Sequence, residues 1–204
     1  PPTPTDAKSS HLLRPACSGL DNAKGKHAEC SIVLKYGMKR DFNLWLTSLG
    51  AAAPVKTLTE LRQWNVAHQK AGAIKYGQAQ LDISDEMDVA MDRVRYEADR
   101  AKNLLLSATQ GIDIVMKRDK LDALLFPGSS GSWVAAMPGY PTVIVPIGFV
   151  PNAPTPPFPE KFNAKPGPYG ASFTGMACSE PRLIEIAYAF EQATKRRVPP
   201  PIVP

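Results

Sequence analysis

The chain has 204 residues, 44% of them hydrophobic, and a formal net charge of +5. This is enough chain for one domain, and a compact fold of this size buries roughly 70% of the surface of the extended chain. No apolar run reaches the roughly 18 residues of a membrane span, and the scattered basic residues lack the stripe and stacking aromatics of nucleic-acid-binding proteins. We therefore expect a soluble protein that binds neither membrane nor nucleic acid, and the sequence leaves its compartment open.

Residues 1–30 begin with a polar, proline-rich stretch, and we expect them to be irregular and exposed. They have neither the basic n-region nor the apolar h-region of a signal peptide. A chain that starts at Pro1 is expected to be processed or to be a piece of a longer protein. Residues 31–204 are expected to form one domain.

The cysteines do not indicate a disulfide framework, because their number is odd and no short pairing motif is present. They are Cys17, Cys30 and Cys178, and a bridge between the first two is left open by the sequence. His27 lies close to Cys30, but no second pair of ligands follows. The sequence therefore predicts no metal site.

A helix is predicted over 32–49, because apolar residues recur along one side of it. These residues are Leu34, Met38, Phe42 and either Trp45 or Leu46. The following segment, 57–60, reads Thr-Leu-Thr-Glu, which is the pattern of a capping box, so a short helix through Trp64 is expected.

The clearest helical periodicity lies at 85–108. Its apolar residues repeat at intervals of three and four: Met87, Val94, Ala98, Ala101, Leu105 and Ala108. Charged residues occupy the other faces, and we interpret them as a solvated surface rather than as a carboxylate pair for acid–base chemistry. A further helical piece is predicted over 111–120.

Three strands are predicted in the second half, at 121–126, 142–145 and 169–176. The run Thr-Val-Ile-Val at 142–145 has no polar alternation, so we expect a strand that is covered on both faces, with the prolines at 141 and 146 at its ends. The proline-rich segment 151–168 is expected to be a long loop within the domain.

The last predicted helix opens at Ser179, Glu180 and Pro181, where the serine can cap it and the other two suit its first turn. One apolar stripe runs along it: Leu183, Ile186, Ala187, Phe190 and Ala193. These elements predict an α/β fold.

Two segments of this region, GYPTVIVPIGF at 139–149 and CSEPRLIEIAYAFEQAT at 178–194, closely resemble the C-terminal end of amidase-signature enzymes. The upstream LDALLFP, at 121–127, also resembles the strand that precedes the family's substrate loop. The matching positions are Gly139, Tyr140, Pro141, Val145, Pro146, Gly148, Glu180, Leu183, Ala187, Tyr188, Ala189, Glu191, Gln192, Ala193 and Thr194. The resemblance implies part of a mixed sheet flanked by helices, as at the C-terminal end of that fold.

The resemblance also implies a chemistry. Amidase-signature enzymes hydrolyse carboxamides, without a cofactor, with a Ser–Ser–Lys arrangement in which the lysine is the base. Serine is a weak nucleophile until a neighbouring group takes its proton, and a Gly-Ser-rich segment supplies donors for the oxyanion. The family carries these residues in an N-terminal part that has no counterpart in this chain, so no catalytic residue is assigned.

The segment 127–132, Pro-Gly-Ser-Ser-Gly-Ser, looks like a short version of the Gly-Ser-rich signature. Its place after LDALLFP instead matches the family's substrate-facing loop and short helix. The resemblance therefore makes Ser129, Ser130 and Trp133 the candidates for the substrate pocket, with Gly128 and Gly131 allowing a close approach of the backbone to a ligand. The alternative is an ordinary strand-to-helix turn in which a serine caps the helix.

Three hypotheses remain open from the sequence. The chain is a fragment of an amidase that is inactive alone and acts on a small amide together with its missing N-terminal half. Alternatively, it is a non-catalytic protein that binds a ligand or partner, or a compact hydrolase that uses Ser129 or Ser130. A truncated sheet leaves an open edge, so we also expect the isolated chain to associate as a homo-oligomer or to aggregate.

Overall fold

The computed structural model describes residues 30–153, 157, 159–160 and 165–198. The chain divides into two compact units at residues 103 and 104, and each unit is described by itself. Residues 1–29, with Cys17 and His27, lie outside the described part; Cys30 is disulfide-bonded, and Cys178 is an exposed free thiol. Within the described residues, no helix combines the length and apolar character needed to cross a bilayer.

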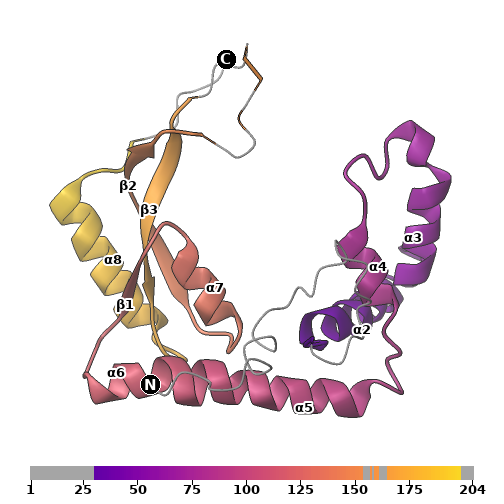
Figure 1. Cartoon of the computed structure of the whole chain (residues 1–204), viewed down its shortest axis with the longest axis horizontal. Helices are drawn as coiled ribbons and strands as arrows, with labels where there is room; N and C mark the ends of the chain where they lie inside the picture. The colour runs from indigo at the N-terminus through magenta and orange to yellow at the C-terminus, as the bar shows by residue number, and fades with distance from the viewer. Residues whose placement is uncertain (1–29, 154–156, 158, 161–164, 199–204) are drawn as a thin grey trace. The chain divides into compact units, whose positions relative to one another are not determined.

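The N-terminal unit is helical (Figure 1). Its elements are α2 (Val33–Ser48), η2 (Gly50–Ala52), α3 (Leu58–Ala67), η3 (Gln69–Ala71), α4 (Ala79–Asp85) and α5 (Arg93–Leu104). The first predicted helix is confirmed, and so is the cap of the second: the Glu60 amide donates to Thr57 Oγ1 over 3.1 Å.

The buried face of α2 agrees with the predicted one only in part. Leu46 is buried as one of the two predicted alternatives, but Leu34 and Trp45 are each 54% exposed, and Lys35 and Tyr36 are buried instead. Tyr36 stacks on Tyr96, with ring centroids 4.4 Å apart, and donates a hydrogen bond to the Val89 carbonyl over 2.6 Å. Hydrophobic periodicity missed this face because a lysine and a tyrosine hold it.

The predicted helix over 85–108 is interrupted. Helix α4 ends at Asp85, and α5 begins only at Arg93, because the Asp88 carboxylate accepts the amides of Ala90 and Met91, each over 2.9 Å. An aspartate that binds nearby amides offers the backbone an alternative to the helix. The predicted apolar stripe is exposed along α5, where Val94 is 78% exposed.

Asp85 joins the three helices α2, α3 and α4. Its carboxylate is 6% exposed and receives Lys39 Nζ at 3.2 Å, Arg62 Nη1 at 2.5 Å and Thr59 Oγ1 at 2.7 Å. Burial by itself raises the pKa of Asp85, but the hydrogen bonds from Thr59, Arg62 and Lys39 outweigh burial, so the pKa lies below its ordinary value. The ionised carboxylate therefore stabilises the N-terminal unit.

We expect Asp85→Asn to destabilise this unit by about 1 to 2 kcal/mol at neutral pH. Because the folded-state pKa is depressed, this stabilisation is complete above the ordinary aspartate pKa of about 4 and is lost as the pH falls through the lower folded-state value. Urea unfolding at pH 7 and pH 3 measures both quantities, with Asp41→Asn as the exposed control. An equal difference between wild type and Asp85→Asn at the two pH values would contradict this role.

The C-terminal unit is a small sheet between helices, which confirms the predicted α/β class with flanking helices. Its elements are η4 (Leu105–Ile112), α6 (Asp113–Arg118), β1 (Leu124–Pro127), α7 (Ser130–Ala136), β2 (Thr142–Val150), β3 (Gly167–Thr174) and α8 (Glu180–Thr194). The strands are antiparallel in the order β1-β3-β2. Helix α8 (yellow) lies on one side of the strands and α7 on the other (Figure 1).

The core of this unit lies between α8 and the sheet. It contains Val145, Ala171, Phe173, Leu183 and Ala187, all buried. The predicted stripe of α8 is thus confirmed at Leu183 and Ala187. The expected cap is wrong in one respect: Ser179 precedes the helix, but its hydroxyl donates to the Met176 carbonyl over 2.7 Å instead of accepting from the helix.

Strand β2 differs from the expectation in two ways. It continues through Pro146 to Val150, with a shift in register between Pro146 and Gly148. Proline is tolerated at this place because β2 is an edge strand and the bulge interrupts the ladder there. On the face opposite to α8 the strand is also only partly covered, since Ile144 there is 48% exposed.

The turn at 139–141 connects α7 to β2. Gly139 adopts φ +82°, which favours glycine, and Tyr140 Oη donates to Asp113 Oδ1 of α6 over 3.0 Å. Burial, together with this hydrogen bond, raises the pKa of Tyr140. The residues of this turn that resemble the family therefore have a structural role, because the hydrogen bond of Tyr140 fixes the start of β2.

Candidate functional site

The connection between β1 and α7 carries the residues that the sequence analysis selected. Gly128 adopts φ +57°, and its amide donates to the Gly170 carbonyl of β3 over 2.7 Å. The Tyr169 ring would lie 3.2 Å from a Cβ at Gly128. Gly128 is therefore required both by the positive φ and by the nearby Tyr169 ring, which leaves little room for a side chain. The turn places the start of α7 beside β3.

The three selected residues are exposed. Ser129 precedes α7 without capping it through its side chain, Ser130 begins it, and Trp133 is 57% exposed. The Ser130 hydroxyl donates to the Pro127 carbonyl over 2.7 Å, and the Ser132 hydroxyl donates to the Ser129 carbonyl over 2.6 Å. The structure thus gathers the serines at the start of α7 and gives two of them main-chain acceptors.

Beneath α7 lies a layer of buried hydroxyl groups that the sequence analysis did not select. Ser172 and Thr174 of β3 are both fully buried. Ser172 donates to the Gly128 carbonyl, and Thr174 Oγ1 lies 2.8 Å from Thr142 Oγ1. The polar residues at 172 and 174 alternate with Phe173, and this period of two was the signal that could have shown a polar face.

Gly131 allows α7 to approach this layer. A Cβ there would lie 2.7 Å from Thr174 Oγ1 and 2.8 Å from Phe126 Cδ2. The close approach that we expected between the backbone and a ligand is therefore, at Gly131, an approach between α7 and the sheet.

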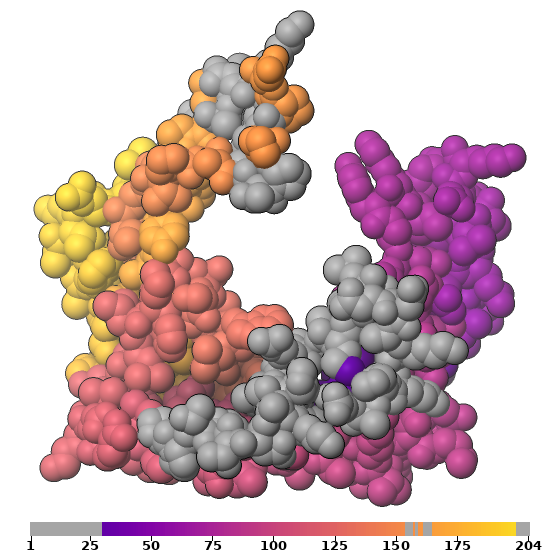
Figure 2. Space-filling view, in the orientation of Figure 1, coloured from indigo at the N-terminus to yellow at the C-terminus, as the bar shows by residue number. Residues whose placement is uncertain are grey.

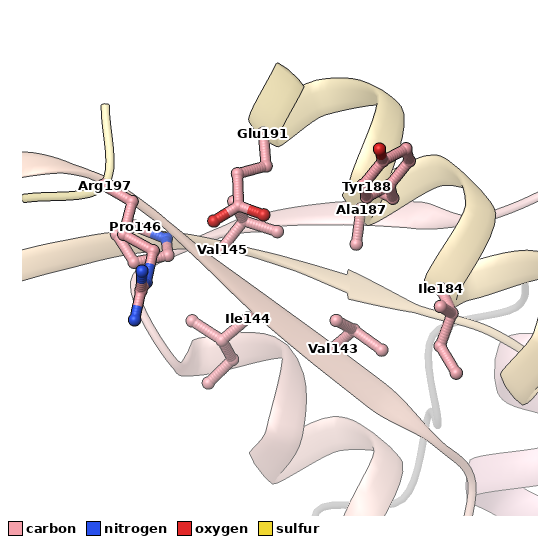
Figure 3. Close-up of a pocket in the computed structure, with 9 residues that line it drawn as sticks. All are labelled: Val143, Ile144, Val145, Pro146, Ile184, Ala187, Tyr188, Glu191 and Arg197. Carbon is pink, nitrogen blue, oxygen red and sulfur yellow. The ribbon is translucent and has the colours of Figure 1, made fainter. Parts of the chain in front are cut away.

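A second feature of the C-terminal unit is a groove of about 360 Å³ between β2 and α8 (Figure 3). Its lining comprises Val143, Ile144, Val145 and Pro146 of β2, Ile184, Ala187, Tyr188 and Glu191 of α8, and Arg197 beyond the helix. Arg197 lies beside Pro146, whereas Ile184 lies toward Val143 (Figure 3). The groove is therefore apolar along most of its length and charged toward one end.

The groove offers apolar contacts and contains no serine, lysine or histidine. Among the described residues, no three histidine, cysteine, aspartate or glutamate side chains come together in a way that would hold a metal ion. The surface at α7 and the groove can thus bind and orient a partner through hydroxyl and apolar groups.

Comparison with known proteins identifies relatives of this chain, although no family model matches it. A probable amidase of Arabidopsis thaliana is 32% identical over 173 residues, which are 84% of this chain and 30% of that protein. A putative amidase of Arthroderma benhamiae is 30% identical over 145 residues, which are 70% of this chain and 24% of that protein.

Solved structures of amidases are also similar to this chain. The native peptide amidase of Stenotrophomonas maltophilia matches with a TM-score of 0.68 and 31% identity, over 82% of this chain and 34% of its own. An amidase family protein of Bacillus anthracis matches with a TM-score of 0.66 and 27% identity, over 83% of this chain and 30% of its own. The chain thus spans about a third or less of the proteins it matches, and by sequence and by fold it belongs to the amidase family.

Proposed function

We propose that this chain is the C-terminal part of a hydrolase that cleaves a carboxamide C–N bond, giving an acid and an amine or ammonia. One observation carries the proposal. Amidases match most of this chain, whereas the chain spans only 24% to 34% of their own length. In this account the catalytic serines and lysine lie in sequence outside these 204 residues.

The hydrogen bonds of the exposed serines support the proposal that the catalytic residues lie outside this chain. A serine nucleophile needs a neighbouring base that takes its proton. Ser130 gives its hydrogen bond to the Pro127 carbonyl, and a main-chain carbonyl does not act as a base of that kind. Ser130 is therefore better suited to contact a substrate than to attack one.

We further propose that Ser129, Ser130 and Trp133 line the substrate pocket of the longer protein. Two exposed hydroxyl groups and an exposed indole lie within the first turn of α7 or directly before it. Hydroxyl groups can bond the substrate amide, and the indole offers an apolar surface for its side chain. The substrate is accordingly a small amide with an apolar substituent.

The isolated 204-residue chain is expected to release no p-nitroaniline from simple p-nitroanilides above the rate of buffer. Ser130→Ala is expected to leave this background unchanged, because the serine does not carry the reaction. Turnover by the chain that disappears in Ser130→Ala, but persists in the Ser132→Ala control, would overturn the proposal in favour of a compact hydrolase.

A further inference from the structure

Both main-chain polar groups of Gly128 are bonded to the central strand β3. The Gly128 amide donates to the Gly170 carbonyl over 2.7 Å, and the Gly128 carbonyl accepts a hydrogen bond from the Ser172 hydroxyl. The first bond joins two main-chain groups and needs no particular side chain on the strand. The second bond depends on a serine, so the side chain of Ser172 contributes directly to holding the turn between β1 and α7.

The hydroxyl of Ser172 is not needed to fill space. The residue is fully buried, and its partners across the sheet are Phe126 of β1 and Ile144 of β2. A buried hydroxyl between apolar neighbours costs free energy unless it is hydrogen-bonded, whereas an alanine would fill most of the same space without that cost. The bond to the Gly128 carbonyl therefore accounts for a serine at this position.

The Gly128 carbonyl controls the direction in which the chain enters α7. It belongs to the same planar peptide group as the Ser129 amide, so its orientation fixes the plane of that group. Gly128 has φ +57° and no Cβ, so its own backbone restricts this orientation little. The Ser172 hydroxyl thus supplies a restraint that the glycine of the turn cannot provide.

Helix α7 follows the turn directly. Its atoms (salmon) form part of the outer surface of the C-terminal unit in the space-filling view (Figure 2). Its inner side packs on the sheet at Gly131, where a Cβ would lie 3.2 Å from Ser172 Cβ. A change in the direction of the turn therefore moves Ser129, Ser130 and Trp133 relative to the sheet.

We propose that Ser172 is a positioning residue for the substrate pocket of Ser129, Ser130 and Trp133. This inference rests on the proposed function. Because Ser172 is fully buried, it does not touch a substrate and acts through the Gly128 carbonyl on the residues that do. Pocket groups need support of this kind to keep their geometry. Without the hydroxyl, the half-buried Gly128 carbonyl turns toward water to regain a hydrogen bond, and the start of α7 shifts with it.

Amide exchange followed by NMR in the 204-residue chain tests the restraint itself. In Ser172→Ala the Gly128 amide is expected to exchange roughly fivefold faster than in wild type, because the turn loses one of its two hydrogen bonds to β3. The amides of α8 should be unchanged. Equal exchange of the Gly128 amide in wild type and Ser172→Ala would overturn the inference. Faster exchange throughout α8 as well would show a general structural role and would also overturn it.

Thr142→Val is the matched control. It removes a hydroxyl that lies on the same face of the sheet but pairs with Thr174 Oγ1, at 2.8 Å, and not with the turn. The Gly128 amide of this variant should exchange at the wild-type rate. An equal acceleration in Thr142→Val would show that any hydroxyl of this layer supports the turn, and would contradict a specific role of Ser172.

Kinetics of the product of the longest reading frame that contains this chain test the consequence for the substrate. With a small carboxamide, Ser172→Ala is expected to raise KM about tenfold and to leave kcat within about twofold, because the residues that it positions bind the substrate while the catalytic residues lie elsewhere. Thr142→Val should leave both constants unchanged. A fall in kcat at constant KM would contradict the proposal.

The two measurements separate this inference from the proposed function. An active long product whose KM does not respond to Ser172→Ala rejects this inference alone. A long product that hydrolyses no carboxamide, although the Gly128 amide responds to Ser172→Ala, rejects the proposed function while confirming that Ser172 fixes the turn.

Discussion

Leu183→Ala is expected to unfold the C-terminal unit at much lower urea concentrations than wild type. Leu183 is fully buried on α8, in the cluster that joins this helix to β2 and β3. Replacing such a leucine with alanine removes its buried methyl groups and leaves a cavity, which costs about 3 to 5 kcal/mol. Far-UV circular dichroism during urea unfolding measures the loss.

The neighbouring Ile184→Ala is the matched control. Ile184 lies on the same helix but is 59% exposed, so the same kind of truncation should change the stability of the isolated chain by less than about 0.5 kcal/mol. Equal losses for the two variants would show that α8 packs on the sheet through a different face.

Gly131→Val is expected to have the second-largest effect, a loss of about 3 kcal/mol, because it overfills the contact between α7 and β3. The new side chain would enter space held by Thr174 Oγ1, Phe126 and Ser172 Cβ, where even a Cβ would lie between 2.7 and 3.2 Å from existing atoms. The helix must then move away from the sheet and carry Ser130 and Trp133 with it.

The control for this change is Gly167→Val. Gly167 belongs to the same unit, and a Cβ there would meet no atom within 4 Å. Urea unfolding and Trp133 quenching by iodide, in a form with Trp45 and Trp64 replaced by phenylalanine, follow stability and the position of α7. A Gly131→Val variant as stable as the Gly167→Val variant would contradict the close packing of α7.

Much of the C-terminal unit could be predicted because local and tertiary preferences agree there. The stripe along α8 has a helical period, and two of its members, Leu183 and Ala187, are the ones that become buried. The turn at Gly139 needs a positive φ, which a glycine supplies. Where the local preference of each residue agrees with the fold, the sequence pattern is sufficient to predict the structure.

Elsewhere a tertiary contact or a local hydrogen bond produced a structure that differs from the one that the sequence pattern predicts. Lys35 is buried at a position that hydrophobic periodicity assigns to solvent, and burial together with the nearby Arg95 lowers its pKa. Asp88 binds two amides and delays the start of α5. Pro146 continues a strand because β2 lies at the edge of the sheet, which the sequence does not state.

The candidate site shows the same limit. Ser129, Ser130 and Trp133 could be selected because they are close together in the sequence and resemble a family loop. Ser172 and Thr174 come from a strand some forty residues later. Their alternation with Phe173 indicates a polar face, but only the register of β3 shows that this face lies against the same helix. The groove beside β2 depends on strand order, and no local pattern encodes strand order.

Amide hydrolysis by the product of the longest reading frame that contains this chain tests the central claim most directly. The account predicts that the long product hydrolyses a small carboxamide while the 204-residue chain, assayed at the same concentration, does not. Hydrolysis by the short chain at a comparable rate would contradict it, because the catalytic residues would then lie within these 204 residues.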